Sequence, residues 1–408
     1  MLNFIWAGFF IIAFIGAIYQ SLIVGDINIW SNLVSATFTS AKAAFEICLN
    51  LTGILCLWLG LLKIASESGL AQFVAKLLHP LFKRIMPDVP ENSPAFGSII
   101  MNIAANMLGL DNAATPMGLK AMEQLQQANP NPQVASKAQQ LFMVINSSAV
   151  TVIPITILMY RSELGASNPA SVFIPILLST SISTLVGFLS IAFVQRLSIF
   201  NKVVMSYIWG AVVFIIGVGW YFSNLDSDKR LLMVSLIGNS ILFGSMVIFI
   251  VLGIIKKVNV YDKFIEGAKE GFSIAIKIIP YLVAMLVAIA VLRTSGVLDI
   301  FICKVKDLFS FWGMNTDFVA GLPTAILKPL SGSGARAMMI ETMQTYGADS
   351  FAGFVSSVIQ GSTETTFYVL ALYFGAVGIT KVGAALPCAL LADIAGIISA
   401  IYFSYIFY

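Results

Sequence analysis

A single carboxylate lies among hydroxyl and amide side chains inside an apolar segment that runs from about Phe351 to Phe374. The polar interruption extends from Gln360 to Phe367, and its acid is Glu364. Hydrocarbon offers no hydrogen bonds, so polar groups at membrane depth need partners in the protein, in water or in a solute. Because an acid at that depth marks a candidate functional site, we expect Glu364 to bind a cation, a proton, or the hydroxyl or amine of a solute.

A second polar interruption breaks the apolar run from Leu141 to Tyr160, beginning at Asn146. At an offset of 215 residues, Asn146 aligns with Gly361 and Ser147 aligns with Ser362. Both runs thus place small polar residues where a membrane helix would otherwise continue. The same kind of polar interruption therefore occurs twice in the chain, and the second copy contains the acid.

The composition is that of a polytopic membrane protein. Hydrophobic residues make up 58% of the 408-residue chain, charged residues make up 11%, and the mean hydropathy is +0.91, unlike soluble domains. The net charge of +3 argues against nucleic-acid binding. Runs near the ~20 residues needed to cross a bilayer are Asn3–Val24, Phe45–Ile64, Ala138–Tyr160, Val172–Val194, Val203–Phe222, Leu231–Ile255, Ile274–Leu292, Phe351–Phe374 and Ala384–Phe407.

The chain also repeats itself at an offset of 227 residues. Ser40–Ile47 matches Gly267–Ile274, and the pair Ser68–Gly69 falls over Ser295–Gly296 in the same register. An amphipathic stretch with helical spacing follows each Ser-Gly pair. We expect each stretch to form a helix, either in the membrane interface or packed on the protein's own surface.

Each half further contains small and polar residues where two short apolar stretches meet. The first such stretch extends from Asn102 to Gly118, and the second extends from Leu327 to Arg336. This pattern is typical of a re-entrant hairpin or an unwound helix, which at membrane depth must be buried in protein or line a wet cavity. An ordinary extramembrane loop is the alternative.

These patterns predict an all-α membrane protein built from two structurally related repeats of membrane helices with broken or re-entrant segments. Residues 1–200 form the first half, residues 201–230 form a joining span, and residues 231–408 form the second half. We expect the halves to superpose, with Lys42 near the place of Lys269 and the joining span outside the superposition. Whether the repeats are parallel or inverted depends on how many broken segments cross fully.

Several of these motifs resemble known families. Asn102–Gly118 and Asn146–Thr151 resemble the bacterial spore maturation protein A family, whereas Glu266–Phe272, Pro329–Gly334 and Gln360–Phe367 resemble the spore maturation protein B family. Apart from the joining span, nearly the whole chain is similar to a natural fusion of the two. These proteins belong to a group with a nucleoside-recognition or Gate domain, which recurs in concentrative nucleoside transporters and ferrous-iron permeases.

The resemblance implies a multi-pass protein of the bacterial cytoplasmic (inner) membrane with a solute-gating element, and it implies no particular substrate. In the nucleoside transporters, a hairpin tip of the type Gly-Gln-Thr-Glu contacts the base. The stretch from Gly361 to Glu364 is similar but has Ser362 at the place of the glutamine. Nucleoside specificity is therefore not carried over to this chain.

Two broken elements that meet near the bilayer midplane suit a transporter site, because helix ends and freed amides supply fixed partial charges. We therefore expect transport of a small polar solute or ion. Lys328 and Arg336 could pair with Glu364 or hold an anionic group, and a buried structural ion pair is the alternative. The candidate binding residues are Gln360, Gly361, Ser362, Thr363, Glu364, Thr365, Lys328, Ser331, Gly332, Ser333, Gly334, Arg336, Asn102, Asn106, Asn112, Asn146, Ser147 and Ser148.

Other functions stay open at this point. The polar residues also suit helix packing in a non-transporting scaffold for envelope, peptidoglycan or spore-cortex maturation, and a lipid translocase or channel is a further alternative. An enzyme is not expected, because the sequence has no metal cluster, catalytic triad or phosphate-binding Gly-Lys motif.

No cofactor or metal is expected either. The four cysteines lack paired ligand spacing, and the single histidine, His79, cannot make a metal centre alone. The expected partners are the lipid bilayer, an unidentified small solute or ion and, as an open alternative, further copies of the chain. No nucleic acid is expected among them.

Overall fold

The computed structural model describes residues 2–90, 92–148 and 150–408, apart from the side chains of residues 2 and 111–113. Within these residues the chain forms helices and no strand, and its one strand-like pairing is an isolated bridge between Val134 and Lys381. The predicted all-α fold class is therefore confirmed. The helices are α1 (Leu2–Tyr19), α2 (Ile29–Glu67), α3 (Leu70–Ile85), α4 (Pro94–Met107), α5 (Asp111–Gln127), α6 (Lys137–Ser147), α7 (Ile155–Glu163), α8 (Phe173–Gln195), α9 (Lys202–Ser223), α10 (Ser227–Ile255), α11 (Val260–Thr294), α12 (Val297–Phe311), α13 (Leu322–Leu327), α14 (Gly332–Tyr346), α15 (Phe351–Gly361), α16 (Thr366–Ala376) and α17 (Ala385–Phe407).

Seven helical segments of the described chain are long and apolar enough to cross a membrane. Two of the nine expected runs are missing from this set, because each is divided into two shorter helices, α6 with α7 and α15 with α16. The divisions fall at the two polar interruptions. The seven segments are Asn3–Val24, Ile29–Glu67, Pro169–Gln195, Lys202–Ser223, Ser227–Ile255, Val260–Thr294 and Ala385–Phe407.

The same succession of elements occurs on both sides of α9. In each half a long helix ends at the Ser-Gly pair, and an amphipathic helix follows, α3 in the first half and α12 in the second. Gly69 has a φ of 82° and Gly296 a φ of 74°, a left-handed conformation that glycine adopts without steric cost. The matched Ser-Gly pairs thus make the same turn. The superposition of the halves stays a prediction.

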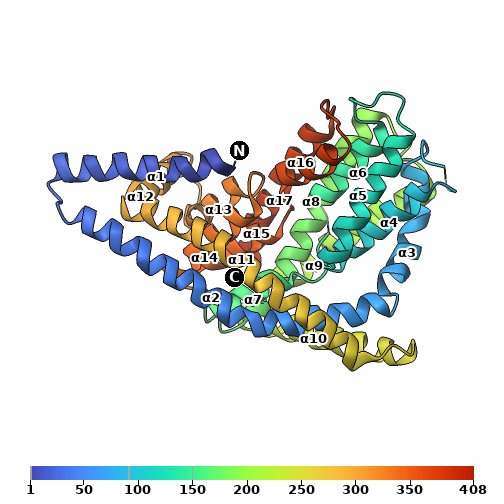
Figure 1. The fold of residues 1–408 in the computed structure, drawn as a ribbon, viewed down its shortest axis with the longest axis horizontal. Helices are drawn as coiled ribbons and strands as arrows, with labels where there is room; N and C mark the ends of the chain where they lie inside the picture. Colours follow the sequence, from blue (N-terminus) through green and yellow to red (C-terminus); the bar gives the residue numbers. More distant parts are fainter. Residues whose placement is uncertain (1, 91, 149) are drawn as a thin grey trace.

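The two long helices α2 and α11 pack against each other over much of their length (Figure 1). Glycines permit the close approach: a Cβ atom added at Gly267 would lie 2.3 Å from the carbonyl oxygen of Leu59. An ion pair of 2.9 Å between Lys63 and Glu266 also joins the helices. With 39 residues, α2 is about 58 Å long, so it exceeds the ~30 Å hydrocarbon core.

Helices of the two halves interleave and do not form separate bodies. α17 of the second half packs against α8 and α6 of the first, and α16 lies beside α5 and α6 (Figure 1). α1 packs against α11 whereas α10 packs against α2, so the corresponding helices exchange partners between the halves. The two broken helices are consequently held against each other.

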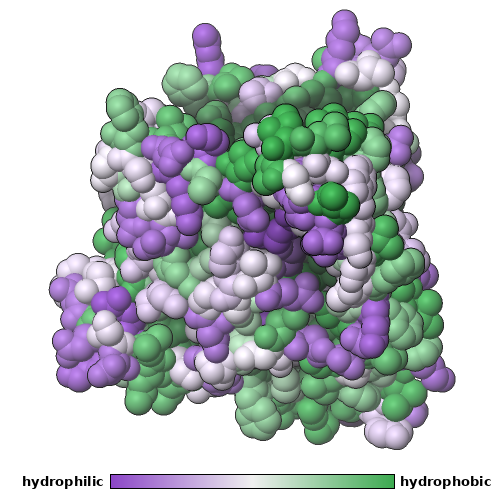
Figure 2. All heavy atoms as spheres, turned by 90° about the vertical axis from the view of Figure 1, so that its left-hand side faces the viewer, coloured by the Kyte–Doolittle hydropathy of each residue, from purple (hydrophilic) through white to green (hydrophobic). Residues whose placement is uncertain are grey.

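Apolar side chains reach the outer surface over wide areas. On the face shown in Figure 2, hydrophobic residues cover much of the surface and hydrophilic residues gather in separate clusters. In α9, which forms the joining span, only 6% of the most apolar 18-residue stretch is buried. Val213 and Trp220 on this helix are exposed. Such surfaces suit hydrocarbon, so the chain is a multi-pass membrane protein.

Candidate functional site

A polar cavity of about 370 Å³ lies where the two halves meet. The first half contributes α2, the end of α4 and α7, and the second half contributes α11, α14 and the break between α15 and α16. Half of the predicted binding residues line this cavity, and they come from both halves. They are Asn106, Lys328, Gly332, Arg336, Gln360, Gly361, Thr363, Glu364 and Thr365.

A backbone hydrogen bond joins the two helix breaks. α15 ends at Gly361 and α16 begins at Thr366, and only the Ser362 amide between them still bonds back to α15. The N–H of Glu364 donates to the carbonyl oxygen of Ser147, the last residue of α6, over 2.9 Å. The carbonyl of a helix C-terminus in one half thus receives its partner from the other half.

Each break is also tied to the helix pair that precedes it in the chain. Within the first break, the N–H of Val152 donates to the carbonyl oxygen of Met107 over 3.0 Å. After the second break, the N–H of Phe367 donates to the carbonyl oxygen of Pro329 over 3.0 Å. Non-helical backbone is therefore satisfied in both halves by the same kind of bond, as membrane depth requires.

Charged side chains of both signs face the cavity. Lys328 is buried, and the guanidinium of Arg336 lies 5.8 Å from the ring centre of Tyr160. Glu364 is exposed in the cavity, and it makes none of the ion pairs found among the described residues. The helix break thus leaves Glu364 facing open space in the cavity, and its role as a ligand for a solute or ion stays a prediction.

Some polar atoms in the cavity wall lack partners. Neither Oε1 of Gln360 nor Nε of Arg336 has a hydrogen-bond partner among the described residues, although both atoms are buried. A buried polar group left unpaired costs about 1–3 kcal/mol. Water or a polar solute in the cavity would remove that cost.

Two glycines let the chain segments around the cavity come close. A Cβ atom at Gly332 would lie 2.7 Å from Oγ1 of Thr365, and one at Gly361 would lie 2.7 Å from Cδ1 of Ile157. The first contact brings the start of α14 against the start of α16. A larger residue at either position would push apart the elements that form the cavity.

Sequence reasoning missed Asp393, a buried acid in the middle of α17. The hydroxyl of Thr366, the first residue of α16, donates to its Oδ2 over 2.7 Å. A signal was available, since Asp393 is an acid inside an apolar run. Asp393 therefore lies behind the α15–α16 break, whose residues line the cavity.

Among the residues whose side chains the structure describes, the other predicted binding residues do not line the polar cavity. The Ser331 hydroxyl accepts a hydrogen bond from Gly334 N–H and caps α14, and the Asn102 amide donates to Ala114 O and Tyr373 Oη. The hydroxyl of Ser362 donates to a carbonyl of its own helix. The side chain of Asn112 lies outside the described residues. The remaining members of this set are Ser333, Gly334, Asn146, Ser147 and Ser148.

This arrangement defines a class, a polytopic helical membrane protein in which two broken helices meet around a polar cavity. The chain belongs to the nucleoside recognition family: the family model, Gate, matches residues 48–167 and 275–380, together more than half of the chain. The matched segments include every residue that lines the polar cavity except Ile274.

Two relatives confirm the resemblance to the spore maturation proteins. The chain is 52% identical to spore maturation protein B of Bacillus subtilis (strain 168) over 149 residues, which cover 36% of this chain and 82% of that protein. It is 37% identical to spore maturation protein A of the same organism over 183 residues, 45% of this chain and 90% of that protein. No solved structure matches the chain.

Proposed function

We propose that this protein transports a small polar solute with an anionic group through the polar cavity between its two helix breaks. The observation that carries the proposal is the charge in the cavity wall. Two cationic side chains, Lys328 and Arg336, and one carboxylate, Glu364, line the same space. The cations would hold the anionic group, and Glu364 would accept a hydrogen bond from a hydroxyl or amine of the solute.

The helix breaks add fixed partial charges to this site. The cavity lining includes residues at the N-termini of α7, α14 and α16, where the positive ends of the helix dipoles lie, and residues at the C-terminus of α15. Broken helices with this arrangement bind solutes and coupling ions in membrane transporters. The hydrogen bond between Glu364 and Ser147 would couple a movement of one half to the other half next to the bound solute.

The relatives support a second candidate role. Both are named for spore maturation, so this chain is also a candidate for a maturation function in which the polar residues serve helix packing. In either role we propose a location in the bacterial cytoplasmic membrane, no enzymatic activity and no cofactor.

Uptake into proteoliposomes tests the transport proposal. The full chain is reconstituted and exposed to a mixture of small anionic and zwitterionic solutes, and the solutes retained inside are identified by mass spectrometry. Arg336→Gln should lower uptake roughly 10- to 150-fold, which corresponds to one lost charge-assisted hydrogen bond. The matched control, Lys306→Gln, removes an exposed cation from α12 and should transport normally.

Two results would contradict transport through this cavity. One is wild-type protein that accumulates no solute under any imposed ion gradient. The other is Arg336→Gln protein that is folded and transports as well as the control. If such a variant still supports maturation in cells, the packing role would be favoured.

A further inference from the structure

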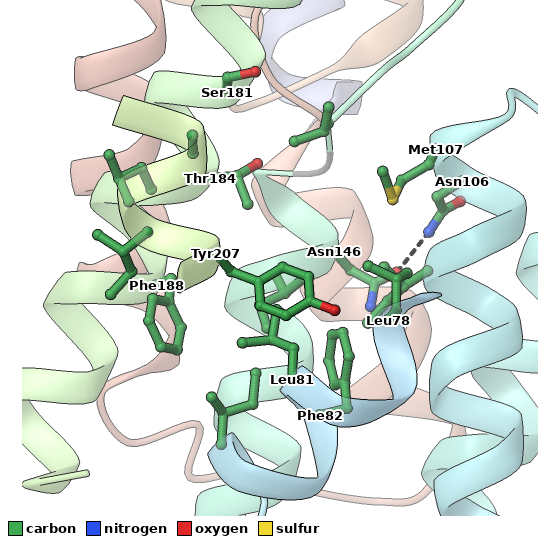
Figure 3. A pocket seen from close by; sticks show the side chains of 17 residues that line it. Leu78, Leu81, Phe82, Asn106, Met107, Asn146, Ser181, Thr184, Phe188 and Tyr207 are labelled. Carbon is green, nitrogen blue, oxygen red and sulfur yellow. Dashed lines mark hydrogen bonds between the residues drawn. The ribbon is translucent and has the colours of Figure 1, made fainter. Parts of the chain in front are cut away.

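A second cavity lies beside the polar one and is almost wholly apolar. It encloses about 290 Å³ between α3, α4, α6, α8 and α9 (Figure 3). Asn106 lines both cavities, so its side chain stands in the wall between them. None of the described residues that line the second cavity is charged, and the apolar ones include Leu78, Leu81, Phe82, Phe188 and Ile208.

The polar side chains in this cavity already make hydrogen bonds within the protein. Asn106 donates a hydrogen bond of 2.9 Å to Asn146, which Figure 3 shows as a dashed line. The other polar lining residues, Asn146, Ser181, Thr184 and Tyr207, each donate to a backbone carbonyl. A polar ligand would therefore find few free donors here, in contrast to the polar cavity with its unpaired buried groups.

The apolar cavity continues to the lipid-facing surface of α9. Tyr207 and Ala211 line both this cavity and an open groove on α9 that also includes Gly210 and Phe214. Tyr207 projects into the cavity in Figure 3, and its hydroxyl donates to a carbonyl of α3. Since Val213 on the same helix is exposed, hydrocarbon is the solvent at the entrance.

We propose that this cavity binds an acyl chain of a membrane phospholipid, which enters between α3 and α9 past Tyr207. An apolar space of this size forfeits van der Waals contacts when it is empty, and acyl chains are the apolar molecules available at its entrance. The end of the chain would reach the wall made by Asn106 and Asn146. This site goes beyond the proposed transport and does not depend on it.

Photolabelling of the full-length protein tests the site. The protein is placed in phosphatidylglycerol nanodiscs that contain a small fraction of phosphatidylglycerol with a diazirine near the end of one acyl chain. Labelled residues are quantified by mass spectrometry after illumination. Phe188, inside the cavity, should be labelled above Ile216, an exposed residue of α9. Ala211→Phe should lower the Phe188 label about tenfold by filling the entrance.

Two further variants make the result decisive. Val213→Phe adds an aromatic ring to the exposed face of α9 and should leave the Phe188 label unchanged. Gly210→Leu narrows the groove, and because a Cβ atom there meets nothing within 4 Å, this variant should fold even if Ala211→Phe does not. Equal Phe188 labelling in wild type and a folded entrance variant would overturn the proposal, as would wild-type labelling no higher than that of Ile216.

Discussion

Replacing Glu364 by Gln should leave the fold intact and weaken transport. The side chain is exposed in the polar cavity and belongs to no ion pair among the described residues. Its backbone N–H, which bonds Ser147 over 2.9 Å, is unaffected by the change. The free energy of unfolding should therefore shift by no more than about 0.5 kcal/mol. Loss of a buried ion-pair partner would instead cost roughly 3–5 kcal/mol.

The functional effect should be much larger than the structural one. Glutamine keeps the shape of glutamate but accepts a neutral hydrogen bond in place of a charge-assisted one, a loss of about 1–1.5 kcal/mol, so solute affinity should fall roughly 5- to 12-fold. Uptake in proteoliposomes measures this loss, and thermal unfolding in detergent should shift by less than about 2 °C. Glu46→Gln, which removes an exposed carboxylate paired with Lys42 at 3.7 Å, should change neither property. A folded Glu364→Gln protein with full uptake would refute the reasoning, as would one that unfolds several kcal/mol more easily.

Two stability predictions accompany this one. Gly396→Ala should destabilise the protein by about 1–3 kcal/mol, because its Cβ would lie 2.5 Å from a methyl group of the α15–α16 break. Gly217→Ala on α9, where a Cβ meets nothing within 4 Å, is the matched control in thermal unfolding, and equal behaviour of the two would contradict the close contact. Arg161→Met should cost about 1–3 kcal/mol by leaving the carbonyl of Ala348, now 3.0 Å from Nη1 of Arg161, without its donor. Lys229→Met, at an exposed ion pair, should cost less than about 1 kcal/mol, and a similarly small loss for Arg161→Met would count against the buried contact.

Much of the helical organisation could be predicted because its signals are local. The turns at Gly69 and Gly296 follow from a residue that tolerates a left-handed backbone, and the helices predicted after the repeated Ser-Gly pairs begin there. The two helix breaks lie at polar interruptions of apolar runs. A run of hydrophobic residues and its interruption are properties of neighbouring residues, so one sequence is enough to find them.

The cavity could be predicted only in part, because it forms from segments far apart in the chain. Small polar residues serve equally well as ligands, helix caps and backbone partners. Ser331 caps a helix and Asn102 donates to a backbone carbonyl. In the sequence both are polar residues within apolar stretches, as is Thr363, which lines the cavity. The direction in which Glu364 points depends on how α16 leaves the break, and nothing near Glu364 encodes the open space that it meets. Asp393, in contrast, could have been found.

The hydrogen bond from Glu364 to Ser147 also has a consequence for protein synthesis, because its acceptor and its donor are made at different times. The Ser147 carbonyl is synthesised first, and at roughly 5–20 residues per second its donor follows about 10 to 40 seconds later. During that interval the first break must stay in contact with water or with another protein, because an unsatisfied carbonyl in hydrocarbon is costly. Since both halves belong to one chain, the rate of synthesis fixes the interval before the bond can form. Two separate chains would instead meet at a rate set by their concentrations.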